Sequence, residues 1–200
     1  MLFEISSGLG ALLTLKGLVN LVLILVAAGI AILVLRRLFS GFLRFGGTRI
    51  VSCPENKQTV AVELDRVHAT LTGVGGKPEL RLTECTRWPE RAGCGQMCLS
   101  QIEASPEGCL LKNILTAWYR GKQCVFCGQD LSNINWMEHR PALRTPEGKT
   151  LRWSEIQPEQ VYGVLETHQP VCWNCHVAEQ FRAEHPELIV DRGMTTTREA

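Results

Sequence analysis

The chain has 200 residues, a formal net charge of +1 and nine cysteines. From residue 51 onward, 16 Lys and Arg residues stand against 19 Asp and Glu residues, a charge of −3. This part therefore lacks the basic surface of a nucleic-acid-binding protein, and the odd cysteine count excludes a chain fully paired in disulfides.

An apolar stretch at residues 18–35 dominates the N-terminal part of the chain. It reads LVNLVLILVAAGIAILVL, with Asn20 as its only strongly polar residue. As a helix it would span roughly 27 Å, close to the hydrocarbon thickness of a bilayer. A cleaved signal peptide would have a shorter apolar core, with basic residues before it and small residues after it, whereas Arg36 and Arg37 follow directly here. We expect a retained membrane anchor.

The charges that flank the span predict its orientation. Lys16 is the one basic residue before it, whereas four arginines follow it closely: Arg36, Arg37, Arg44 and Arg49. Because basic flanks stay in the cytosol, we expect a single-pass membrane protein with a cytosolic C-terminal domain. The cytosol also keeps thiols reduced and free for metal. Ala27 and Ala31 are spaced so that two anchors could pack together, which leaves a homo-oligomer open.

The residues after the span predict the division of the chain. Apolar side chains among the arginines indicate that the first turns lie in the headgroup region: Phe39, Phe42, Leu43 and Phe45. Gly46 and Gly47 then form a hinge. We expect an anchor at residues 1–47, a first cysteine module at 48–118, a zinc-ribbon-like module with a structured insertion at 119–190 and a tail at 191–200.

Residues 48–118 contain a first group of cysteines. Strands are expected at 50–52, 59–64 and 79–83, with a glycine-rich turn at 73–78 between the last two. Two cysteines, Cys53 and Cys85, follow the first and last of these strands. Cys94 and Cys98 would share one face of a helix at 95–102. The hypothesis is a second four-thiolate site formed by Cys53, Cys85, Cys94 and Cys98, for which the sequence signal is weaker because only Cys94 and Cys98 are closely spaced.

Zinc is the first choice for this group, but alternatives stay open. The Cys53-Pro54 step also occurs in ferredoxins, which favours an iron–sulfur cluster, although the closely spaced cysteines of ferredoxins are absent. The four residues could also be buried thiols without a metal. Cys109 precedes a helical pattern at 110–119 and is expected in the core, although it could replace Cys85 as a ligand.

Two cysteine pairs form the clearest motif of the chain: Cys124-Val-Phe-Cys127 and Cys172-Trp-Asn-Cys175. Two residues between cysteines let both thiolates of a tight turn face one point, and two such turns complete the four-sulfur shell that suits Zn²⁺. Gly128 would supply the reversal after the first pair. The pattern resembles the zinc-ribbon class, in which two such turns clamp one structural zinc. The 44 residues between Cys127 and Cys172 exceed the usual ribbon spacing.

The segment between the two pairs is expected to be structured. It contains a hairpin turn at 145–149, a strand at 150–153 and a helix at 158–167 with Pro158 at its first position. Four tryptophans are expected to pack in the core of this module: Trp118, Trp136, Trp153 and Trp173.

The second pair also matches the attachment signal for c-type haem, Cys172-x-x-Cys175-His176, in which the histidine binds the iron. Met137 or Met194 would then be conceivable axial ligands. The expected cytosolic location and the presence of the partner pair argue against haem. With four thiolates on one metal, His176 is expected to cap the helix or to face solvent.

These patterns predict an α+β protein: one N-terminal transmembrane helix followed by a small mixed domain built around one or two four-cysteine metal sites. Four thiolates leave no open position for water on zinc, and the chain lacks the helical His-Glu-x-x-His pattern, a phosphate-binding loop and a nucleophile elbow. An enzyme is therefore disfavoured. The expected function is a protein-interaction or adaptor module with a protein partner, and the alternative is membrane-anchored electron transfer through iron–sulfur or haem.

Overall fold

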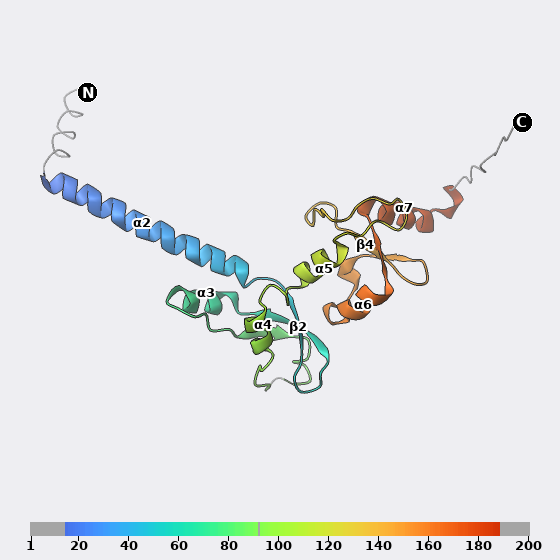
Figure 1. Cartoon of the computed structure of the whole chain (residues 1–200), viewed down its shortest axis with the longest axis horizontal. Coiled ribbons are helices and arrows are strands. Elements are labelled where there is room, and N and C mark those ends of the chain that lie inside the picture. The colour runs from blue at the N-terminus through green and yellow to red at the C-terminus, as the bar shows by residue number, and fades with distance from the viewer. Residues whose placement is uncertain (1–14, 92, 189–200) are drawn as a thin grey trace, which may run out of the picture. The chain divides into compact units, whose positions relative to one another are not determined.

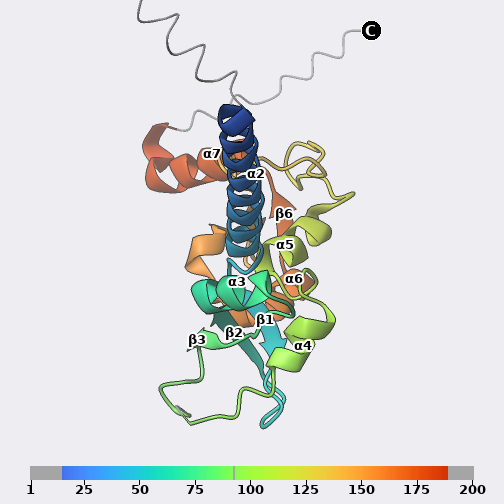
Figure 2. The ribbon, with the colours of Figure 1, turned by 90° about the vertical axis from the view of Figure 1, so that its left-hand side faces the viewer.

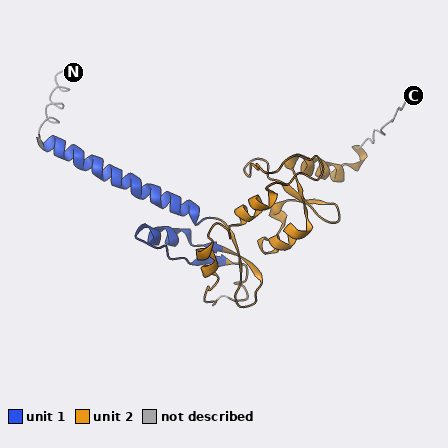
Figure 3. Ribbon diagram, in the orientation of Figure 1, with its two compact units in different colours: residues 1–46, 63–84 blue, residues 47–62, 85–200 orange. Residues whose placement is uncertain are grey.

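The computed structural model describes residues 15–91 and 93–188 (Figure 1). The predicted tail at 191–200 and the candidate haem ligand Met194 lie outside these residues. The chain divides into two compact units (Figure 3). Unit 1 comprises Met1–Gly46 and Glu63–Glu84, and unit 2 comprises Gly47–Val62 and Cys85–Ala200. The first boundary falls between the two glycines of the expected hinge.

Unit 1 contains the helix α2 (Leu15–Arg44), which is 30 residues long. The predicted span at 18–35 lies wholly inside it. The helix is long and apolar enough to cross a membrane, and its most apolar 18-residue window is not buried within the protein. At about 1.5 Å per residue the helix measures roughly 45 Å, so it continues past the span through Arg36 and Arg37.

Unit 1 also contains a second helix, α3 (Arg66–Val74), where the sequence predicted only a turn between strands. The prediction was wrong because residues 66–74 contain β-branched residues and a glycine, which weaken a helical pattern. The helix starts at Asp65, whose carboxylate accepts a hydrogen bond from the His68 backbone amide at 2.9 Å. It runs antiparallel to the end of α2, because Gly41 approaches Thr70 and Gly46 approaches Arg66.

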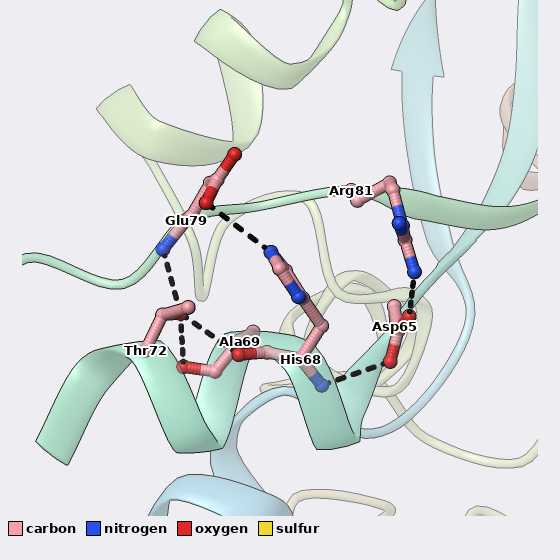
Figure 4. Close-up of polar contacts among 6 residues, drawn as sticks. All are labelled: Asp65, His68, Ala69, Thr72, Glu79 and Arg81. Carbon is pink, nitrogen blue, oxygen red and sulfur yellow. Dashed lines mark hydrogen bonds and ion pairs between the residues drawn. The ribbon is translucent and has the colours of Figure 1, made fainter.

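One face of α3 is tied to the segment that follows it (Figure 4). The Arg81 guanidinium donates to Asp65 at 2.8 Å, and His68 lies 3.3 Å from the Glu79 carboxylate. The backbone amide of Glu79 donates to the Thr72 hydroxyl at 3.0 Å. These contacts fix α3 on two sides, against α2 and against residues 79–81, and leave its third side uncovered within the unit.

The first sheet has the strand order β1-β2-β3 (Figure 2). It consists of β1 (Arg49–Ser52), β2 (Thr59–Leu64) and β3 (Leu82–Cys85). The strands β1 and β2 are antiparallel, with Arg49 opposite Val62 and Ser52 opposite Thr59. The third strand was expected at 79–83 and begins three residues later.

The helix α4 (Leu99–Ala104) lies beside β1. The helix expected at 95–102 thus begins four residues later than predicted, at Leu99. Gln96 has a φ of +51°, which a right-handed helix cannot contain. Cys94 and Cys98 consequently do not share a helical face, and this part of the prediction was wrong. The helix at 110–119 is confirmed as α5 (Leu111–Tyr119).

The second sheet, in unit 2, has the order β5-β4-β6 and is antiparallel. Its strands are β4 (Ala142–Arg144), β5 (Thr150–Leu151) and β6 (Gln169–Val171). The predicted turn at 145–149 joins β4 to β5. The strand expected at 150–153 ends at Leu151, before the 3-10 turn η1 (Trp153–Glu155). The helix expected at 158–167 is confirmed as the 3-10 turn η2 (Pro158–Gln160) followed by α6 (Val161–Thr167).

The chain leaves β6 directly into α7 (Trp173–Glu184), followed by η3 (Pro186–Leu188). A core forms around Tyr119, which is fully buried and whose hydroxyl donates to the Ala142 carbonyl at 2.8 Å. The hydroxyl accepts a hydrogen bond from the Trp153 indole at 3.0 Å. Trp118 and Trp136 pack edge-on against the Tyr119 ring, so three of the four tryptophans contribute to the core as expected. All four tryptophans are half-buried, and Trp173 is not among the described residues that pack against this core.

Candidate metal centre

The first cysteine pair lies in a tight hairpin turn. The Cys124 backbone amide donates to the Gln129 carbonyl at 2.8 Å, and the Gly128 amide donates back to the Cys124 carbonyl at 2.9 Å. Residues on either side of the turn, Gln123 and Asp130, pair in an antiparallel bridge. Gly128 has a φ of +73°, which confirms the reversal that the sequence predicted and explains why a glycine stands there.

The second pair lies where β6 meets α7. Cys172 is the N-cap residue of α7, and its sulfur accepts a hydrogen bond from the Cys175 backbone amide at 3.5 Å. Residue Cys175 therefore stands in the first turn of the helix, on the same side as Cys172. A β-strand that ends one residue before the first cysteine and a helix that contains the second hold both sulfurs close to regular backbone.

Hydrogen bonds join the two turns. The Val125 amide donates to the Pro170 carbonyl at 3.0 Å, and the Cys172 amide donates to the Cys124 sulfur at 3.3 Å. The sulfur atoms of Cys127 and Cys172 are 3.7 Å apart. All four sulfurs lie within 4.8 Å of one another. A tetrahedron with metal–sulfur bonds of about 2.3 Å has edges of about 3.8 Å, so the spacing suits a four-thiolate zinc site.

The centre lies at the edge of the core. Cys124 and Cys172 are buried among the core residues, Cys175 is half-buried and Cys127 is exposed. Burial opposes ionisation of Cys124, but the backbone amides of Cys172, Cys127 and Phe126 outweigh it and lower the pKa of this thiol to about 7. Burial, followed by the neighbouring sulfurs, raises the pKa of Cys175. Four thiolates at this spacing would repel one another strongly, and a bound cation removes that repulsion.

His176 is fully buried, so the expectation that it caps the helix or faces solvent was wrong. Its Nδ1 lies 2.9 Å from the Thr150 hydroxyl, and its Nε2 accepts a hydrogen bond from the Arg152 guanidinium at 3.2 Å. Burial, and then the charge of Arg152, lower the pKa of the imidazole and favour its neutral form. Both ring nitrogens are engaged in the core contacts that join α7 to β5.

The geometry of the four sulfurs is that of two clamping turns, as in the zinc-ribbon class. No family model, characterised protein or solved structure matches the chain. The four-cysteine group is therefore a finding from this structure alone, and membership of the zinc-ribbon class stays a prediction.

The other predicted ligands are less closely gathered. Among the residues that the structure describes, only the group of Cys124 brings three or more His, Cys, Asp or Glu ligand atoms within 4.8 Å of one another. Cys98 is buried and directly precedes α4, whereas the remaining three are half-buried: Cys53, Cys85 and Cys94. Cys109 is half-buried, with its sulfur 3.7 Å from the Gln101 carbonyl oxygen.

Sequence reasoning missed the residues that support the centre. Arg152 reaches His176 from 24 residues away, and it also donates to Gln180 of α7 at 2.9 Å. Thr150 completes the contact from β5. Nothing in the local sequence marks these residues, because the contacts form only once the second sheet has assembled.

Proposed function

We propose that the protein is a single-pass membrane protein whose C-terminal domain, stabilised by a structural zinc ion, acts as a protein-interaction module on the cytosolic side. The convergence of four cysteine sulfurs from Cys124, Cys127, Cys172 and Cys175 carries this proposal. Zinc binds four thiolates in a tetrahedron, and its d electrons favour no other coordination geometry. The donor set therefore fits zinc well.

A structural role follows from the coordination. Four thiolates close the shell, so no position is left for the water or substrate that a catalytic zinc needs. The nearest other metal-binding side chain in sequence, His176, is engaged by Thr150 and Arg152. Zinc binding at such a site contributes about 10 kcal/mol or more to folding. That contribution matters because the core around Tyr119 is small.

Electron transfer is the alternative, and the structure supports it less well. A c-type haem would need His176 as an iron ligand, but this ring is buried and bonded on both sides. It would also need the sulfurs of Cys172 and Cys175 for thioethers, whereas they lie in one group with two further sulfurs. Iron bound by the same four thiolates would be intensely coloured, so the colour of the pure protein distinguishes it from zinc.

The membrane part of the proposal is supported by α2 and by the third side of α3. Val67 and Leu71 of α3 are 58% and 62% exposed, and Val74 extends the same stripe by one turn. Because α3 runs antiparallel to the end of α2, the end of this stripe with Val74 lies nearest the apolar span. An apolar stripe beside the arginines that follow a span is typical of a helix in the headgroup region.

The interaction role has a candidate surface in unit 2. A pocket is lined by Trp153, Trp173, Arg152 and Met137, and Met137 is 86% exposed. Methionine, tryptophan and arginine side chains are the types that protein interfaces favour. A photo-cross-linking residue at Met137 should therefore capture a discrete partner in cells, whereas the same residue at the exposed turn position Glu147 should not. Equal capture at both positions would contradict this assignment.

Two measurements test the rest of the proposal. Element analysis of the full chain, purified in detergent without added metal, should find zinc and little iron in a colourless sample. For the orientation, Glu147→Cys should react with a membrane-impermeant thiol reagent only after the cells are permeabilised, whereas Ser7→Cys, on the other side of the span, should react in intact cells. A coloured iron protein would reject structural zinc, and the reverse labelling pattern would reject the cytosolic domain.

A further inference from the structure

We propose that Cys53, Cys85, Cys94 and Cys98 bind a second zinc ion, because the turn at Cys53 has the same backbone structure as the metal-binding turn at Cys124. This site goes beyond the proposed function: the first centre can hold its metal whether or not the second exists. All four cysteines belong to unit 2.

The two turns have matching hydrogen bonds. The Cys53 amide donates to the carbonyl five residues later, on Gln58, at 2.8 Å, and the Lys57 amide donates back to the Cys53 carbonyl at 2.8 Å. In the turn at Cys124, the corresponding bonds join Gln129 and Gly128 to the cysteine at 2.8 and 2.9 Å. The flanking residues also match, because Ser52 pairs with Thr59 as Gln123 pairs with Asp130.

The backbone reversal is the same, although the residue differs. Lys57 has a φ of +59° at the position where Gly128 has +73°. Among the described residues, the non-glycine residues with positive φ are Lys57 and Gln96, and both lie in turns that carry these cysteines. A side chain in this conformation costs roughly 1 kcal/mol, and such strain concentrates at functional sites. A metal bound across the two turns would offset it.

Donors also surround the Cys53 sulfur. The Arg87 guanidinium donates to it at 3.1 Å and binds the Glu55 carboxylate at 2.8 Å. The backbone amides of Glu55 and Asn56 interact with the sulfur, as those of Phe126 and Cys127 do with Cys124. Amide and guanidinium donors stabilise a thiolate ligand and compensate the charge of a four-thiolate zinc site.

The turn at Cys98 is held beside the turn at Cys53. The Gln101 side chain of α4 accepts from the Ser52 amide at 3.0 Å and donates to the Ser52 carbonyl at 2.6 Å. Cys98 stands three residues before Gln101 and is 7% exposed. Burial first, and then electrostatic repulsion from the thiols of Cys85, Cys94 and Cys53, raise its pKa.

Cys85 is positioned by its neighbour Thr86. The Thr86 amide donates to the Ala61 carbonyl at 3.0 Å, and its hydroxyl accepts from the Ala61 amide at 3.2 Å. These bonds fix the end of β3 against β2. Asn56 occupies the place that Cys127 has in the other turn, so the remaining sulfurs must come from elsewhere in the chain. Zinc binding would draw the four sulfurs into the closer spacing seen at the first centre.

Zinc content per chain tests the site directly. The full chain in detergent should hold two zinc ions, and Cys53→Ser and Cys98→Ser should each hold one. Cys124→Ser should also hold one, and the control Cys109→Ser should hold two. Helix content by circular dichroism checks that the variants stay folded, and one retained zinc in a Cys53→Ser chain shows that the first centre is intact.

A rescue experiment tests the likeness of the turns. In the double variant Cys53→Ser with Asn56→Cys, the new thiol stands where Cys127 stands in the other turn and faces the same point. Two zinc ions should therefore return. The proposal is overturned if the unmodified protein binds only one zinc ion, and if Cys124→Ser removes this ion whereas Cys53→Ser keeps it. That result would leave the proposed function intact. Iron at the second site in place of zinc, or a double variant with one zinc, would also overturn it.

Discussion

A substitution at Cys127 distinguishes a metal centre from ordinary packing of the cysteines. Its side chain is exposed, whereas Cys124 and Cys172 are part of the core. Replacing an exposed thiol with a hydroxyl of similar size changes stability by about 0.5 kcal/mol or less when nothing is bound. In contrast, Cys127→Ser removes one of four ligands if the sulfur binds zinc. The same substitution therefore has two very different expected effects, with and without metal.

The size of the effect follows from linkage. Zinc at about 1,000 times its dissociation constant stabilises the folded state by about 4.1 kcal/mol. If the lost ligand weakens binding about 100-fold, the same zinc concentration stabilises the variant by only about 1.4 kcal/mol. The difference of about 2.7 kcal/mol corresponds to a fall in Tm of roughly 10 °C or more for a domain of about 100 residues.

Thermal unfolding in detergent, followed by circular dichroism, measures this difference. We expect Cys127→Ser to melt well below the unmodified protein in buffered zinc and at the same temperature in excess chelator. Cys109→Ser is the matched control, because this half-buried thiol contacts the Gln101 carbonyl and lies outside the four-sulfur group. Its effect should not depend on zinc. Equal melting temperatures for Cys127→Ser and the unmodified protein in zinc would refute the reasoning.

Three further predictions concern the same unit. Since the pKa values of Cys172 and Cys175 are raised above the ordinary thiol value of 9.0, both thiols lose protons on binding zinc at neutral pH. Zinc affinity should therefore fall by about two powers of ten or more for each unit by which the pH lies below about 9; a competing chelator measures this, and a pH-independent affinity would contradict it. Tyr119→Phe removes the hydroxyl that donates to the buried Ala142 carbonyl and accepts from the Trp153 indole, and should destabilise unit 2 by about 1–3 kcal/mol in urea unfolding, with unchanged zinc content. Gly128→Ala meets no neighbouring atom within 4 Å, so it should cost only the roughly 1 kcal/mol of its positive φ and keep its zinc; loss of metal would show that the turn has a further constraint.

Local patterns predicted the parts of the structure that depend on local physics. The apolar run at 18–35 lies within α2, and the pattern at 110–119 became α5. Gly128 was expected to reverse the chain and does so with positive φ. Two cysteines separated by two residues share a turn whatever surrounds them, and both pairs do so here.

Local patterns failed where a contact distant in sequence decides the conformation. The helix α3 exists because α2 and residues 79–81 pack against it, not because residues 66–74 favour a helix strongly. The positive φ of Gln96 interrupts the helix expected at 95–102. His176 looked like a surface residue because its partners, Thr150 and Arg152, lie more than 20 residues away.

The sequence alone predicts that thiols are presented in pairs, that one helix is apolar enough for a membrane and that residues 51–200 carry a charge of −3. Which sulfurs meet depends on the tertiary structure. The spacing within each pair is set by one turn of backbone, whereas the 3.7 Å between Cys127 and Cys172 depends on β6 pairing with β4 and on the bond from Val125 to Pro170. The tertiary structure also revealed that the turns at Cys53 and Cys124 are alike. The likeness lies in the backbone hydrogen bonds and φ angles, and the side chains of the two turns do not show it.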